Sequence, residues 1–177
     1  VDGKHVVRLD KEKIDYLPKS LEDKMLTKVE EGVKDADTIL VSDYAKGFIT
    51  QRIALELVRV SKKHQKILIV DTKPKHFLWF KGCYCIKPNK VEAEEFTGIK
   101  IESTKDAEKV ALKISDILQT NVLLTLGSMG MTLCELEEGV VSHFTTRAKD
   151  VFDVTGAGDT VLAVFGLALA SGASLRQ

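Results

Sequence analysis

Two apolar stretches, Thr38-Ile39-Leu40-Val41 and Ile67-Leu68-Ile69-Val70, decide the fold class of this chain. Continuous apolar runs of this length are typical of strands that are buried on both faces of a sheet. The segment between them, 49–64, repeats apolar residues at the spacing of one helical face. A strand, a helix and a second strand in this order indicate two parallel strands in an α/β fold.

The same alternation continues along the rest of the chain. Further helices are predicted over 17–33, 91–96 and 104–118, further strands over 6–9, 83–86 and 121–126, and a hairpin over 131–136 and 140–145. Ser20-x-x-Asp23 is a weak capping pattern near the start of the first helix. The last helix, 158–171, is apolar on nearly every face, so we expect it to be buried. The prediction is a largely parallel sheet flanked by helices, with a C-terminal hairpin before the last helix.

Length and composition set limits on the function. The 177 residues are enough for one domain with a sizeable core. Lys and Arg number 26 and so do Asp and Glu, and this balance argues against a nucleic-acid-binding protein. The longest apolar stretch, Val161 to Ala170, is too short to span a bilayer. Three cysteines are too few for a secreted disulfide framework and favour a reducing compartment.

Several residues that could bind a ligand come directly after the predicted strands. They are Asp43, Asp71, Asn89 and Gly127. In open parallel sheets, ligands bind at the carboxyl ends of the strands. The sequence therefore predicts a binding site at this edge of the sheet.

The segment Asp153-Val154-Thr155-Gly156-Ala157-Gly158-Asp159-Thr160 leads from two glycines directly into the last helix. A helix start offers unpaired N–H groups and the positive end of the helix dipole, and glycines let a phosphate approach the backbone. Asp159 could accept the proton of an incoming hydroxyl there. The alternative is a tight turn followed by a capping carboxylate.

Residues 153–159 resemble the second signature of the ribokinase-like (PfkB-type) carbohydrate kinases, Asp-Thr-x-Gly-Ala-Gly-Asp, with Val-Thr in place of Thr-x. The resemblance implies a ribokinase-like fold and an ATP-dependent kinase. It also implies that Asp159 is the catalytic base and that the amides of Gly156, Ala157 and Gly158 form an anion hole.

Two weaker motifs match the same family in the same order. Asn89 and Glu92 resemble its Asn-x-x-Glu motif, which implies a Mg²⁺ ion held near both residues and ATP phosphates beside Asn89. Thr125-Leu126-Gly127-Ser128-Met129-Gly130 resembles the nucleotide-side loop, which implies ATP contacts at Thr125, Gly127 and Gly130. A helix-capping pattern and an ordinary strand-end turn are the alternatives for these two segments.

The segment Val41-Ser42-Asp43-Tyr44-Ala45-Lys46-Gly47 resembles the heptose 7-phosphate kinase branch of the family, the kinase half of bacterial ADP-heptose synthases. This implies acceptor contacts at Asp43 and Lys46. Lys73 and Arg147 also lie in segments similar to that branch and are predicted phosphate contacts, with solvated surface charge as the alternative. Thr72 and Pro74 depart from the pattern of the branch, which usually has Asp-Pro-Lys.

Together these features predict transfer of a phosphoryl group from ATP to a hydroxyl of a small sugar or sugar phosphate, in particular a heptose phosphate. We expect Mg²⁺ as a cofactor, a cytoplasmic location, no nucleic-acid or membrane partner, and compatibility with a homodimer. Residues 1–177 are expected to be a partial kinase domain that phosphorylates nothing well alone. A kinase for another sugar, a nucleoside or a vitamin, and a non-catalytic nucleotide-binding module, remain the alternatives.

Overall fold

In the part of the chain that the structure describes, six strands form one sheet, in the order in which they occur in the sequence. The computed structural model describes residues 15–146 and 156–177. Strands β1 to β4 run parallel, and β4, β5 and β6 are antiparallel neighbours. The predicted α/β class and the hairpin before the last helix are confirmed. The strand predicted over 6–9 lies outside the described residues.

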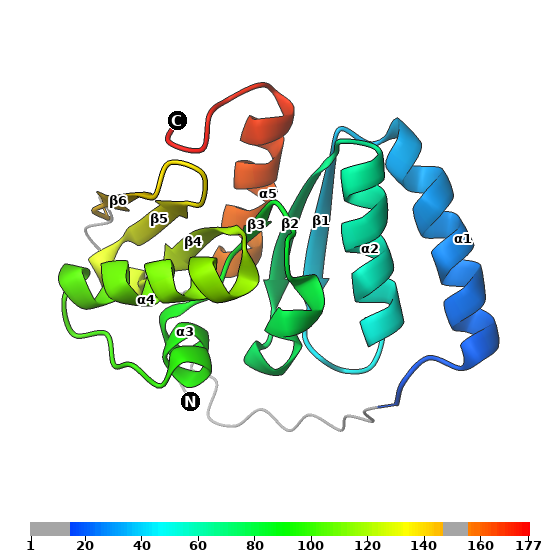
Figure 1. Ribbon diagram of the computed structural model, residues 1–177, viewed down its shortest axis with the longest axis horizontal. Coiled ribbons are helices and arrows are strands. Elements are labelled where there is room, and N and C mark those ends of the chain that lie inside the picture. The colour runs from blue at the N-terminus through cyan, green and yellow to red at the C-terminus, as the bar shows by residue number, and fades with distance from the viewer. Residues whose placement is uncertain (1–14, 147–155) are drawn as a thin grey trace, which may run out of the picture.

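The elements follow one another along the chain as strands and helices in near alternation (Figure 1). The strands are β1 Thr38–Asp43, β2 Ile67–Thr72, β3 Cys85–Ile86, β4 Asn121–Thr125, β5 Met131–Glu135 and β6 Val140–Phe144. The α-helices are α1 Lys19–Asp35, α2 Gln51–Lys63, α3 Lys90–Thr97, α4 Thr104–Leu118 and α5 Ala157–Ala170, and the short 3₁₀ helices are η1 Pro74–Phe80 and η2 Gly127–Met129.

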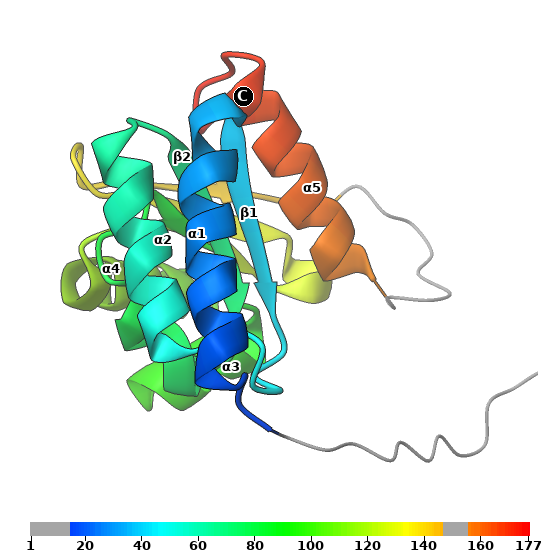
Figure 2. The same ribbon diagram turned by 90° about the vertical axis from the view of Figure 1, so that its right-hand side faces the viewer.

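Helices cover both faces of the sheet, and the alternation of side chains along each strand serves both layers. Figure 2 shows α5 on one side of β1 and the pair α1 and α2 on the other. In β2, Leu68 and Val70 join the core cluster under α2 and α4, whereas Ile69 joins the cluster under α5. Because both faces of the sheet are buried, the sequences of these strands are continuous apolar runs.

Local hydrogen bonds fix the helix starts. Thr50 caps α2 by accepting a bond from the amide of Ile53, and α4 begins with a capping box of Ser103 and Asp106. Helix α1 begins after Pro18, which provides no side-chain cap. The predicted capping role of Ser20-x-x-Asp23 is therefore wrong, because both residues lie inside the helix.

Helix α5 is more exposed than its apolar sequence predicted. Its residues Leu162, Gly166 and Leu169 pack on β1 and β2, but Val164 and Leu167 are 62% and 69% exposed. The prediction that this helix is buried on every side is therefore wrong. Only one stripe of the helix faces the sheet, and the described residues leave the opposite stripe open.

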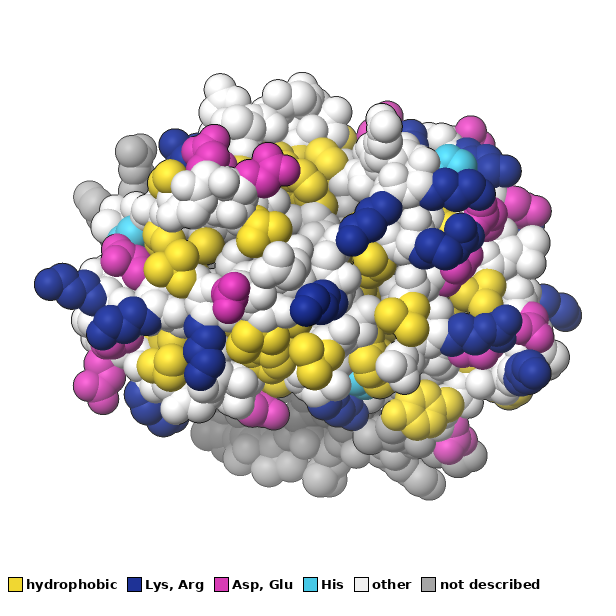
Figure 3. All heavy atoms as spheres, viewed as in Figure 1, with side chains coloured by type: hydrophobic (Ala, Val, Ile, Leu, Met, Phe, Trp, Pro, Cys, Tyr) yellow, Lys and Arg dark blue, Asp and Glu magenta, His cyan; other side chains and the backbone are white. Residues whose placement is uncertain are grey.

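The described part of the chain mixes charges on its surface and contains no membrane span. On the face drawn in Figure 3, Lys and Arg side chains are interspersed with Asp and Glu. Within residues 15–146 and 156–177, no helix has the length and apolar content needed to cross a bilayer.

Gly130, in the turn that joins η2 to β5, lies so close to Phe144 that only a glycine fits there. Its φ is +89°, and a Cβ at this position would lie 1.9 Å from the carbonyl oxygen of Phe144. Gly139, in the β5–β6 turn, also has positive φ, but a Cβ there would meet nothing within 4 Å. We predict that Gly130→Ala lowers the free energy of unfolding by more than about 3 kcal/mol, and Gly139→Ala by about 1 kcal/mol. Urea denaturation of the complete gene product checks this, and equal losses would contradict the close approach of Phe144.

Candidate functional site

Asp43, at the end of β1, anchors the loop that follows. Its Oδ2 accepts a hydrogen bond from Thr72 Oγ1 at 2.6 Å and lies 2.7 Å from His76 Nδ1, while its Oδ1 accepts one from the amide of Ala45 at 2.8 Å. The side chain is only 3% exposed. Asp43 was predicted to contact the acceptor directly. That contact stays a prediction; in the structure the buried carboxylate of Asp43 holds the loop through these hydrogen bonds.

The anchored loop presents Tyr44 to the first turn of α5. The Tyr44 hydroxyl donates to Asp159 Oδ2 at 2.8 Å, and Ser42 Oγ donates to Asp159 Oδ1 at 3.3 Å. The hydrogen bond to the Asp159 carboxylate is the main cause of a raised pKa at Tyr44. Lys46 lies on the same loop, with its Nζ 5.9 Å from the centre of the Tyr44 ring.

The start of α5 has the features of an anion site. Gly156 is the N-cap residue with φ +77°, and a Cβ added to it would meet nothing within 4 Å. Ala157, Gly158 and Asp159 form the first turn, where backbone N–H groups have no partner within the helix. Asp159 is exposed, so a hydroxyl and a phosphate can both reach this turn from solvent.

An ion pair that sequence reasoning missed lies beside this turn. Lys87 Nζ is 2.6 Å from Asp71 Oδ2, and the two side chains are 3% and 21% exposed. Burial is the main cause of a raised pKa at Asp71, which the charge of Lys87 partly offsets. A Cβ on Gly158 would lie 3.5 Å from Lys87 Nζ. No motif marks Lys87, although a lysine directly after an apolar strand was a usable signal.

Asn89 and Glu92 form a capping box at the start of α3. Asn89 Oδ1 accepts from the amide of Glu92, and Glu92 Oε2 accepts from the amide of Asn89, each at 3.0 Å. Lys73 Nζ lies 2.8 Å from Glu92 Oε1, and this hydrogen bond is the main cause of a raised pKa at Lys73. The structure thus shows the capping alternative for these residues, and metal binding at Asn89 and Glu92 stays a prediction.

The nucleotide-side loop lies next to the capping box. Thr125 pairs with Asn89 in an isolated parallel bridge, and its amide donates to the carbonyl of Pro88 at 3.0 Å. Gly127 begins η2, and Gly130 follows it with its amide bonded to the carbonyl of Gly127. Thr125, Gly127 and Gly130 therefore lie at the carboxyl end of β4, as predicted. Arg147 lies outside the described residues.

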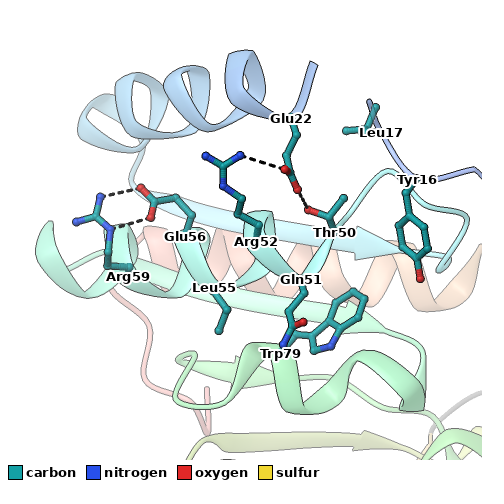
Figure 4. Close-up of a pocket in the computed structure, with 10 residues that line it drawn as sticks. All are labelled: Tyr16, Leu17, Glu22, Thr50, Gln51, Arg52, Leu55, Glu56, Arg59 and Trp79. Atoms are coloured by element: carbon teal, nitrogen blue, oxygen red, sulfur yellow. Dashed lines mark hydrogen bonds and ion pairs between the residues drawn. The ribbon is translucent and has the colours of Figure 1, made fainter. Parts of the chain in front are cut away.

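A separate surface groove of about 690 Å³ lies between α1 and α2 (Figure 4). Its charged residues bind one another: Arg52 pairs with Glu22 at 3.1 Å, and Arg59 pairs with Glu56 at 2.7 Å. The pair of Arg52 with Glu22 joins α2 to α1, whereas Arg59 and Glu56 both lie on α2. The chemistry of the groove is thus that of a helix–helix contact, and the strand-end residues remain the better candidate site.

The chain is similar in sequence to known proteins. The chain is 36% identical over 176 residues to a protein of Desulfatibacillum aliphaticivorans named "Bifunctional protein HldE", covering 98% of this chain and 36% of that protein. The chain thus spans about a third of the length of this relative.

Solved structures share the fold. Arabidopsis thaliana ribokinase, in complex with ribose and ATP, matches with a TM-score of 0.70 and 24% identity over 84% of this chain and 48% of its own. Escherichia coli phosphofructokinase-2, in complex with substrates and products, matches with a TM-score of 0.69 and 23% identity over 88% and 52%. The family model described as pfkB family carbohydrate kinase matches residues 8–177. The chain therefore belongs to the pfkB family of carbohydrate kinases.

Proposed function

We propose that this chain carries the phosphoryl-transfer centre of a kinase that moves the γ-phosphoryl group of ATP to a hydroxyl of a heptose phosphate. The observation that carries the proposal is the position of Asp159. Its carboxylate lies in the first turn of α5, within hydrogen-bond distance of Tyr44 and Ser42, and beside the glycines of the helix start. A proton acceptor and an anion site are thus adjacent, as phosphoryl transfer requires.

Two requirements of the transfer, a proton acceptor and a partner for the charge of the transferred group, are met by groups in this arrangement. Asp159 takes the proton of the acceptor hydroxyl, and the hydroxyl oxygen forms a bond to the γ-phosphorus. The bond between that phosphorus and the bridging oxygen breaks, and ADP leaves with the electron pair. The amides of the first turn of α5 stabilise the negative charge on the transferred group, since they are fixed before the reaction begins.

The described residues fit Mg²⁺ as a partner of the phosphates more closely than as an ion in a protein cage. Within residues 15–146 and 156–177, no group of three or more His, Cys, Asp or Glu side chains could hold a metal ion. Both oxygens of Glu92 already accept hydrogen bonds. Mg²⁺ bound to nucleotide phosphates commonly keeps several waters, through which Asn89 and Glu92 would hold it. Bound there, the ion would neutralise phosphate charge.

The choice of a heptose phosphate rests on sequence. The segment from Ser42 to Gly47 resembles the heptose 7-phosphate kinase branch, and HldE proteins are among the relatives. The Asp43 anchor and the Tyr44 contact give this segment a place beside Asp159. The reaction needs ATP, so we also propose that the protein acts in the cytoplasm.

A substrate panel tests the acceptor. We expect the complete gene product, with ATP and Mg²⁺, to phosphorylate D-glycero-D-manno-heptose 7-phosphate with a higher kcat/KM than ribose, fructose 6-phosphate or a nucleoside. ADP release by a coupled assay is the measurement. A preference for another member of the panel would keep the kinase and reject the heptose. ATP binding without turnover of any acceptor would instead favour a non-catalytic module.

Substitution of the proposed base tests the mechanism. Asp159→Asn keeps the size of the side chain but removes its ability to accept a proton, so we expect kcat to fall by about 10²–10⁴ with ATP affinity nearly intact. Asp116→Asn, an exposed position on α4, is the matched control and should leave kcat unchanged. A normal rate for the Asp159 variant would reject the assignment.

Spectrophotometric titration tests the contact between Tyr44 and Asp159. The carboxylate disfavours the phenolate, so the pKa of Tyr44 lies above its ordinary value. In Asp159→Asn this negative charge is gone, and we expect the Tyr44 phenol to ionise at lower pH than in the unaltered protein. Tyr44→Phe lacks the phenol of Tyr44, so the part of the absorbance change that is lost in this variant belongs to Tyr44. An unchanged Tyr44 titration would show that the two side chains are not in contact in solution.

A further inference from the structure

Lys87 is the feature near the site that the proposed mechanism does not use. Its side chain is 3% exposed, and lysines are seldom buried to this extent unless they are paired, as Lys87 is with Asp71. A buried ion pair is weak evidence for stability, because removing two charges from water costs much of what their attraction returns. The position of this pair in the fold therefore needs another explanation.

The alternation of side chains along β2 and β3 puts Lys87 on the face of the sheet that α5 covers. Cys85 in β3 and Ile69 in β2 belong to the core cluster under α5. Lys87 and Asp71 each lie two residues further along, and side chains two residues apart share a face of a sheet. The amide of Lys87 donates to the carbonyl of Val70 at 2.8 Å, which continues the β2–β3 register up to the ion pair.

The glycine at position 158 keeps the space above Lys87 open. A Cβ there would lie 3.5 Å from Lys87 Nζ and 3.9 Å from Asp71 Oδ2. Any longer side chain would stand between the ammonium group and the first turn of α5. The turn therefore has a positive charge directly beneath it, next to the backbone amides that face an incoming anion.

We propose that Lys87 is a catalytic residue that contacts the phosphoryl group during its transfer, and that Asp71 holds the ammonium group in place until the phosphoryl group arrives. This inference rests on the proposed function and adds a side-chain cation to its anion site. The strength of the contact follows from burial, because an ammonium group acts more strongly on a nearby charge when water is excluded. The ammonium has three N–H donors, so it can bond to Asp71 and to a phosphoryl oxygen together.

A purely structural role for the pair makes a different prediction. If Lys87 only balances the charge of Asp71, then Lys87→Met leaves a half-buried carboxylate without its cation, and the double variant Asp71→Asn with Lys87→Met removes that unpaired charge. If Lys87 contacts the phosphoryl group, the double variant stays slow, because the cation is still missing. Comparison of the single and double variants thus separates the two roles.

The experiment measures kcat and nucleotide binding on the complete gene product. We expect Lys87→Met to lower kcat by about 10²–10³ and to leave the affinity for ADP with Mg²⁺ essentially unchanged. Aluminium fluoride, which mimics the phosphoryl group in flight, should tighten ADP binding in the unaltered protein and fail to do so in Lys87→Met. The double variant should behave like Lys87→Met, and the exposed Lys81→Met should behave like the unaltered protein.

The possible outcomes separate the role of Lys87 from the proposed function. Recovery of kcat in the double variant, or tightening by fluoride in Lys87→Met, would overturn the role of Lys87 while the kinase assignment stands. If aluminium fluoride tightens ADP binding in the unaltered protein but no sugar is phosphorylated, the proposed acceptors are rejected. The ADP affinities of the unaltered protein and Lys87→Met would still test the role of Lys87. Unaltered protein that binds ADP neither with nor without fluoride would reject both proposals.

Discussion

The packing of α5 along β1 and β2, with its first turn at the carboxyl end of β1, is the constraint on which the rest of the site depends. Leu162 and Leu169 bury one stripe of the helix against the sheet, and this sets the position of its first turn. The first turn then lies where Ser42 and Tyr44 leave β1, so residues more than a hundred positions apart in sequence meet at Asp159. Hydrophobic burial far from the chemistry thus fixes the geometry of the polar groups.

Charges of both signs lie at the strand ends and in the first turns of the helices beside them. Asp159, Asp71 and Glu92 supply carboxylates, and Lys87 and Lys73 each pair with one of them. Burial is the main cause of the raised pKa of Asp71, and the negative charges of Glu92 and Asp159 raise it further, so the three carboxylates interact electrostatically. An arrangement of this kind is suited to a substrate that brings both phosphate groups and a divalent cation.

The sequence predicted the parts of the fold that depend on local pattern. Apolar runs located β1, β2 and β4, and the turn at Gly139 located the β5–β6 hairpin. Burial of whole elements and the environment of single charges depend on packing between distant segments. For that reason the exposed face of α5, the burial of Asp43 and the pair of Lys87 with Asp71 were not predicted. The role of Asn89 and Glu92 could not be predicted from sequence either, because the same spacing fits a capping box and a metal-binding motif.

A crystal structure of the complete gene product with ADP, Mg²⁺ and aluminium fluoride would show directly where the transferred phosphoryl group binds. We expect the fluoride group to lie at the first turn of α5, within hydrogen-bond distance of its backbone amides, between the carboxylate of Asp159 and a terminal β-phosphate oxygen of ADP. A fluoride group bound away from this turn, with Asp159 facing solvent or protein alone, would contradict it.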